Sequence, residues 1–157
     1  MANDSRNYPV GSGFPKSFRR NDTFVDIGVT KTQRTRATTA QVNAGLILLP
    51  AIPGVKWRIV DVSLIAIGGA ATTNTSVDLL GTKSAAASRP LVAAVAALTQ
   101  NTLLRAGATN AVILAGGASF TAHDANTAIS ITKQSGGSSM TVATHIDVQL
   151  TYVADAA

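Results

Sequence analysis

Apolar and polar residues alternate along several segments of this chain, with the period of two that half-buried β-strands show. The most regular alternation is in residues 145–152, where every second residue from Ile146 to Tyr152 is apolar or aromatic. The longest predicted strand covers residues 57–67 and ends at a Gly-Gly pair. One face of that strand would carry Val60, Val62, Leu64 and Ala66.

Shorter segments of the same kind indicate further strands at residues 25–29, 46–49, 75–80 and 129–131. Turns rich in Gly, Pro and Ser separate several of them. About eight strands at regular spacing predict an all-β fold, and the Gly-rich turns between them favour a jelly-roll-like β-sandwich.

Two segments leave alternatives open. Residues 91–105 fit a helical spacing as well as a strand pattern, but their β-rich surroundings favour two strands, at about 91–97 and 102–105. Residues 30–43 are rich in Thr, Gln and Arg. They are either a polar edge strand or a continuation of the N-terminal segment.

The N-terminal segment differs from the rest of the chain. Residues 1–22 show no periodic apolar face and contain the Tyr8-Pro9 and Phe14-Pro15 pairs on either side of a Gly-Ser-Gly sequence. We expect an extended arm that becomes ordered on contact with a partner and uses its scattered aromatic side chains as anchors. The predicted organisation is therefore an extended basic arm, residues 1–40, followed by a β-sandwich domain, residues 41–157.

Positive charge is concentrated in the same part of the chain. The 157 residues include 13 Lys and Arg against 8 Asp and Glu, a formal net charge of +5. The first 36 residues hold only three Asp, but their basic residues are Arg6, Lys16, Arg19, Arg20, Lys31, Arg34 and Arg36. Such a segment favours an anionic partner. An acidic protein surface fits it, whereas the three Asp dilute the charge and make nucleic acid the less favoured partner.

The composition gives little support for catalysis. Without Cys there is no disulfide, thiolate metal site or Cys nucleophile, and Glu is missing as well. His123-Asp124 lies in a sequence typical of a turn, and His145 would face outward on a predicted strand. The chain has no Gly-x-Ser-x-Gly sequence and no complete phosphate-binding loop. We therefore predict no enzymatic activity, no metal and no cofactor.

The apolar runs of the chain are shorter than the ~20 residues that a membrane helix needs, and no signal-peptide pattern is visible. We expect a soluble protein, made in the cytoplasm, with no membrane partner. Aromatic residues are only 4% of the chain, so the core must consist of smaller side chains. A domain of this kind gains stability by burying more surface against copies of itself or against a partner.

The later part of the chain resembles a known class of proteins. The Ala, Gly and Thr-rich sequence of residues 108–121, its continuation through residues 127–131, and the alternating residues 146–152 carry the resemblance. They are similar to small β-domain structural proteins of tailed bacteriophages, especially head decoration (capsid cement) proteins. The resemblance covers about residues 55–153.

This resemblance implies a non-enzymatic virion protein on the outer surface of the capsid. It would form a homotrimer, lay its arm across neighbouring subunits of the major capsid protein, and stabilise the shell by bridging them. The expected capsid-binding residues are Phe14, Phe18 and Phe24 as apolar anchors, with Arg19, Arg20, Arg34 and Arg36 as ion-pair partners. The alternative is a head-fibre, tail or receptor-binding β module, which would favour aromatic residues in loops.

Overall fold

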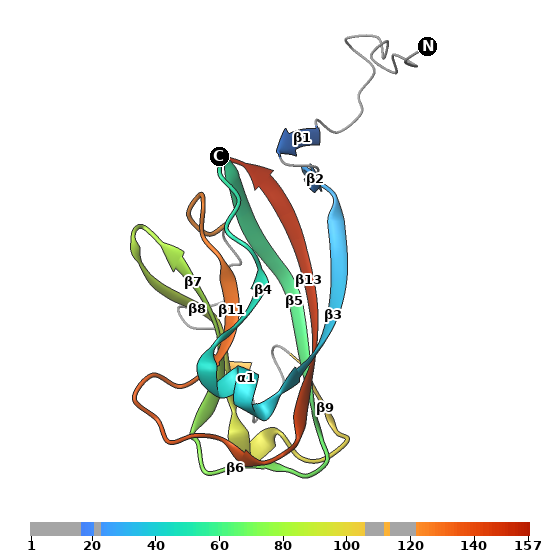
Figure 1. Ribbon diagram of the computed structural model, residues 1–157, viewed down its shortest axis with the longest axis vertical. Helices are drawn as coiled ribbons and strands as arrows, with labels where there is room; N and C mark the ends of the chain where they lie inside the picture. Colours follow the sequence, from blue (N-terminus) through green and yellow to red (C-terminus); the bar gives the residue numbers. More distant parts are fainter. Residues whose placement is uncertain (1–16, 21–22, 106–111, 114–121) are drawn as a thin grey trace.

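The computed structural model describes residues 17–20, 23–105, 112–113 and 122–157. Two antiparallel sheets pack face to face, as expected for a β-sandwich (Figure 1). The four-stranded sheet has the order β3 (Thr30–Thr38), β13 (His145–Ala156), β5 (Val55–Ile67) and β9 (Leu103–Arg105). The five-stranded sheet has the order β10 (Val112–Ile113), β8 (Ala86–Ala94), β7 (Ser76–Lys83), β11 (Ile129–Lys133) and β4 (Leu46–Leu49).

The pairing of these strands defines a jelly roll. Strand β3 pairs with β13, β4 with β11, β5 with β9, and β7 with β8, so the strands pair from the two ends of the domain inward. A long antiparallel hairpin that is rolled into two facing sheets has this pattern. The sequence-based prediction of an all-β, jelly-roll-like sandwich is therefore confirmed.

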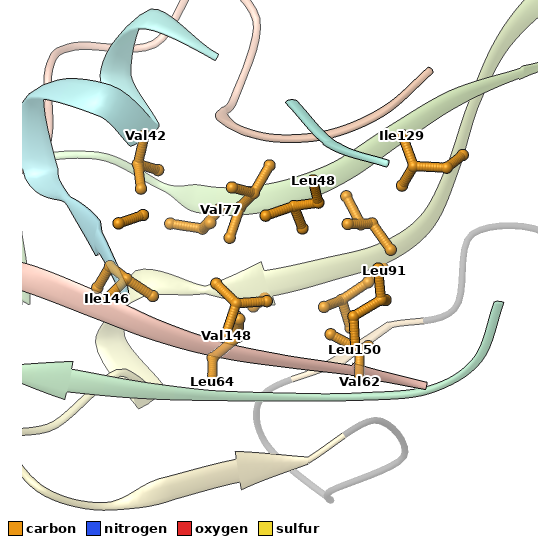
Figure 2. Packing of buried hydrophobic residues seen from close by; sticks show 14 of the residues in the cluster. Val42, Leu48, Val62, Leu64, Val77, Leu91, Ile129, Ile146, Val148 and Leu150 are labelled. Carbon is orange, nitrogen blue, oxygen red and sulfur yellow. The ribbon is translucent and has the colours of Figure 1, made fainter. Parts of the chain in front are cut away.

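The side chains that the two sheets direct toward each other form the core (Figure 2). The four-stranded sheet contributes Val62, Leu64, Ile146, Val148 and Leu150, and the five-stranded sheet contributes Leu48, Val77, Leu91 and Ile129. None of these side chains is more than 6% exposed. Burial of aliphatic groups stabilises a fold by ~0.8 kcal/mol per methylene, so alternation along each strand is enough to specify which face turns inward.

One residue of the longest strand faces the other way from the prediction. Val60 was expected beside Val62 on the apolar face, but it is 42% exposed. The reason is a β-bulge in β5: Thr151 pairs with Asp61 and the next residue of β13 pairs with Ile59, which leaves Val60 without a partner. The extra residue reverses the direction of the side chains on one side of it.

The ambiguous segment 91–105 is mostly extended. Strand β8 runs to Ala94, a short 3-10 helix (Val95–Ala97) follows, and β9 begins at Leu103. The preference for strands over a long helix was correct, although the first strand ends three residues earlier than predicted.

Residues 30–43 contain both an edge strand and an unpredicted helix. Strand β3 pairs with β13 over nine residues, so it belongs to the sandwich, and the assignment of residues 1–40 to an arm extends too far. Helix α1 (Thr39–Ala44) then begins with a capping box, in which Thr38 and Gln41 hydrogen bond to each other's backbone N–H groups. Ser/Thr followed three residues later by Glu/Gln is a helix-start pattern that the sequence does contain.

The N-terminal strands form a sheet of their own. Strands β1 (Ser17–Arg20) and β2 (Thr23–Asp26) pair only with each other and lie near the end of the sandwich where the C-terminus also lies (Figure 1). The predicted strand 25–29 thus stops at Asp26. At the opposite end, β6 (Ala71–Thr72) and β12 (Thr141–Val142) make a second short pair. In the described part of the chain, no helix has the length and apolar character to span a membrane.

A substitution at Gly81 tests the packing of β7 against the segment that precedes β11. A Cβ atom at this position would lie 2.6 Å from Nδ1 of His123 and 2.8 Å from Cδ1 of Ile129. We expect Gly81→Ala to lower the free energy of unfolding by about 1–3 kcal/mol, because the side chains of both His123 and Ile129 must move. Urea unfolding measures this, with Ala87→Ser at an exposed position of β8 as the control. A loss below about 0.5 kcal/mol would contradict the packing.

Candidate functional site

The residues predicted to hold the arm on a partner do not form one site. Phe14 lies outside the described residues. Phe18, Arg19 and Arg20 are in β1, where Phe18 pairs with Val25 and Arg19 with Phe24 of β2. The other two predicted residues, Arg34 and Arg36, lie within β3, on the four-stranded sheet. The predicted set is therefore divided between the hairpin beyond the end of the sandwich and the outer face of the sandwich (Figure 1).

Arg34 and Arg36 share a carboxylate of their own chain. Two residues apart on β3, both point outward and converge on Asp147 of the neighbouring strand β13. Nη2 of Arg34 donates to Oδ2 of Asp147 at 2.9 Å. Arg36 donates from Nε to Oδ1 at 2.7 Å and from Nη2 to Oδ2 at 2.9 Å, which is a bidentate contact. Bidentate arginine–carboxylate pairs are the strong ion pairs of proteins.

The ion pairs fix the protonation state of Asp147. Its side chain is only 4% exposed, because the two arginine side chains cover it. The hydrogen bonds from Arg36, and then the one from Arg34, lower the pKa of Asp147 from 3.8 to about 2. The same contact raises the pKa of Arg36. The carboxylate is therefore a structural anion that orients two cations.

The outer faces of the two arginines remain in solvent. The side chains of Arg34 and Arg36 are 67% and 59% exposed. Two cations with one carboxylate carry a net charge of +1, so this part of β3 can still contact an anionic partner. Both arginines hold a fixed position on the sheet and do not belong to a separate arm.

The remaining carboxylates of this outer face are also paired with arginines. Nη2 of Arg58 lies 2.6 Å from Oδ2 of Asp155, and Nη2 of Arg105 lies 2.9 Å from Oδ2 of Asp61. General acid–base work on a substrate needs a carboxyl group that is free to exchange a proton. On this sheet, the carboxylates of Asp147, Asp155 and Asp61 are instead each paired with arginine.

His123 and Asp124 connect two loops. Backbone N–H groups of both residues donate to backbone carbonyls, and the ring of His123 donates from Nδ1 to the Thr82 carbonyl at 3.2 Å. The Asp124 carboxylate accepts from the backbone N–H groups of Ser84 and Ala85, the turn between β7 and β8, at 2.8 and 2.9 Å. These hydrogen bonds hold the segment that contains His123 and Asp124 against the end of β7 and the turn that follows it, in agreement with the interpretation of the pair as part of a turn.

One pocket of the described structure was missed by sequence reasoning. It has a volume of about 170 Å³ and lies where β2 and β3 meet the ends of β4, β5 and β13. Trp57 and Tyr152 form one wall, with ring centroids 5.6 Å apart and planes at 85°. The available signal was weak: the sole Trp falls on the mixed face of the strand predicted at residues 57–67, and Tyr152 falls on the apolar face of the last predicted strand.

Among the residues that the structure describes, no cluster of three or more His, Cys, Asp or Glu side chains could hold a metal ion. The chain matches no known protein-family model, and comparison with curated proteins and with solved structures finds no similar protein. The site must therefore be interpreted from its own geometry.

Acid unfolding tests the cluster around Asp147. Because its pKa is lower in the fold than the ordinary 3.8, its contribution to stability is complete above about pH 4 and is lost as pH falls through about 2. The shift corresponds to at most about 2 kcal/mol, and solvent screening of the exposed arginines reduces it. We expect Asp147→Asn to lose about 1 kcal/mol at pH 7 and to flatten the stability profile between pH 4 and 2.

The matched control is Asp155→Asn, which removes a more exposed carboxylate from the same strand and the same face. Chemical denaturation at several pH values measures both variants. Equal losses at pH 7, or an unchanged acid profile in Asp147→Asn, would contradict the structural role of this carboxylate.

His123 predicts a second pH dependence. Burial lowers its pKa below the ordinary 6.5, so the folded protein binds fewer protons there than the unfolded chain. Stability should therefore fall as pH is lowered through 6.5, and His123→Gln should remove this slope. Unfolding measured from pH 7.5 to 5 tests the expectation, and an unchanged slope in His123→Gln would refute it.

Proposed function

We propose that this protein is a non-enzymatic structural protein of a bacteriophage particle. It binds the outer capsid surface as a homotrimer and stabilises the shell by bridging subunits of the major capsid protein. The observation that carries the proposal is the hairpin β1–β2, which contains Arg19 and Arg20, precedes the edge strand of a jelly-roll domain and belongs to neither of its sheets. Jelly rolls are common among capsid proteins, and a segment outside the sandwich is suited to contact a neighbour.

The use of the acidic residues supports a structural role. In the described part of the chain, Asp147, Asp155 and Asp61 are paired with arginines on one sheet, and Asp124 caps a turn. Asp26 pairs with Lys31, and Asp78 with Arg89. Each carboxylate is thus engaged in holding the fold. The chain also has more basic than acidic residues, 13 against 8, which suits contact with an acidic protein surface.

The two groups of arginines would act differently in this function. Arg19 and Arg20 belong to the hairpin, and Phe18 and Phe24 of the same hairpin, with Phe14 before it, would supply apolar anchors. Arg34 and Arg36, oriented by Asp147, would add a fixed basic contact beside it. Ordering an arm on a partner costs conformational entropy, which a large contact area offsets.

The copy number of the protein in purified virions tests the proposal. We expect about one copy per major capsid subunit, or a fixed simple ratio to it, by quantitative mass spectrometry. A few copies per particle would point instead to a head-fibre, tail or receptor-binding module. Absence from the particle would refute the structural proposal.

A charge reversal tests the role of the hairpin. We expect Arg19→Glu with Arg20→Glu to weaken binding to capsids lacking the protein by about tenfold or more, because two attractive contacts become repulsive. Co-sedimentation with such capsids measures the binding. Lys56→Glu, on the outer face of the sandwich, is the control for the single variant Arg19→Glu, because both change the net charge by the same amount. Equal losses in both would show that only the overall charge matters.

A further inference from the structure

Strand β3 has one edge that no other strand of the described structure covers. It is the last strand of its four-stranded sheet, and β13 is its neighbour on one side (Figure 1). All nine of its residues pair with β13 in a regular register, without a bulge, and the strand contains no proline. Short length, bulges and prolines are common devices that keep a free edge from pairing, and β3 has none of them.

The backbone groups of every second residue point toward this free edge. The N–H of Thr39 donates to the carbonyl of Thr144 at 3.1 Å, which continues the ladder between β3 and β13. In an antiparallel ladder every second residue bonds to a given neighbour, so the odd-numbered residues of β3 bond to β13. The N–H of Thr38 agrees with this, since it donates to Oε1 of Gln41 at 2.8 Å. The N–H and C=O groups of Thr32, and of the even-numbered residues around it, therefore face away from β13.

The side chains along the same edge are polar or positively charged. The even-numbered residues of β3 direct their side chains to the outer face of the sheet, and Arg34 and Arg36 are the two cations among them. Both guanidinium groups are more than half exposed and are held from the β13 side by Asp147. Side chains on one face of a strand repeat every two residues. Carboxylates at alternate positions of an added strand would therefore face the two arginines.

A second copy of β3 is not the occupant that this edge favours. In the registers that pair most of the strand, two antiparallel copies would bring their arginines close to each other, and like charges opposite each other destabilise a strand pair. A strand with acidic side chains converts the same positions into attractive pairs. The charge of the edge therefore distinguishes between the two kinds of strand.

We propose that an extended acidic segment of a partner protein adds to the free edge of β3, as a further strand of the four-stranded sheet, with carboxylates at alternate positions facing Arg34 and Arg36. The backbone groups of the edge supply affinity, and the two arginines select acidic side chains. For the origin of the segment, which would be a capsid subunit, this inference rests on the proposed function. The edge itself can be tested without any capsid.

Binding of short peptides to the full-length protein tests the side-chain requirement. The blocked peptide Thr-Val-Glu-Val-Glu-Val-Thr should bind at least about tenfold more tightly than its counterpart with Lys in place of both Glu. We expect Arg34→Gln with Arg36→Gln to weaken binding of the acidic peptide by about tenfold. The matched control is Arg58→Gln with Arg105→Gln, which removes the same charge from the same sheet away from β3. It should leave the affinity within about twofold of the wild type, as measured by titration calorimetry.

A backbone substitution makes the test independent of charge. Thr32→Pro removes one N–H of the free edge and keeps the bonds to β13, and proline is tolerated at such edge positions. It should weaken binding of the acidic peptide by about tenfold, because a carbonyl of the added strand loses its donor. Thr32→Val is the control, since it keeps the N–H and loses only the hydroxyl that contacts Thr151 at 3.0 Å. Circular dichroism verifies that the variants are folded.

Unchanged peptide binding in Thr32→Pro, or equal losses in the two arginine double variants, would overturn the proposal. Self-association of the wild type that Thr32→Pro abolishes would also overturn it, because a second copy would then occupy the edge. Failure of the acidic peptide to bind at all would overturn the docking of an acidic strand. It would leave the proposed function standing, since that is tested separately by the copy number in virions.

Discussion

The sandwich depends on the pairing of β13 with two strands that lie far from it in the sequence. Its twelve residues pair with β3 on one side and with β5 on the other. Inward residues of the three strands supply one half of the core, and their outward residues carry the arginine–aspartate pairs. Without β13, β3 would have no strand to pair with in this sheet, and the core residues that pack against Leu150 would be exposed to water.

The charges of the outer face follow from this pairing. In an antiparallel ladder, residues opposite each other on one face lie close enough for their side chains to meet. Asp147 is therefore within reach of Arg36 directly opposite and of Arg34 two residues along, and Asp61 is within reach of Arg105. On this sheet, aspartates pair with arginines and hold the arginine side chains in fixed positions, while the outer atoms of the arginines remain exposed.

Alternation was enough to predict the fold class and most strand positions, because only one register buries Ile146, Val148 and Leu150 together. It could not predict the bulge at Val60, since an extra residue leaves the local pattern apolar and is revealed only by the partner strand. The helix after Thr38 was missed although its capping box is visible in the sequence. The site was harder to predict: the convergence of Arg34 and Arg36 on Asp147 joins residues more than a hundred positions apart. The pocket depends on the meeting of five strands, which no local pattern records.

The sequence distance between paired strands also determines when the protein can fold. Arg34 and Asp147 are separated by 113 residues, and β3 finds its partner only when β13 exists. During synthesis β3 therefore keeps an unpaired edge until β13 has left the ribosome. Folds dominated by such distant contacts form slowly. The outward face of β3 carries threonines and arginines, and such polar and charged side chains disfavour pairing of its free edge with other chains before β13 is available.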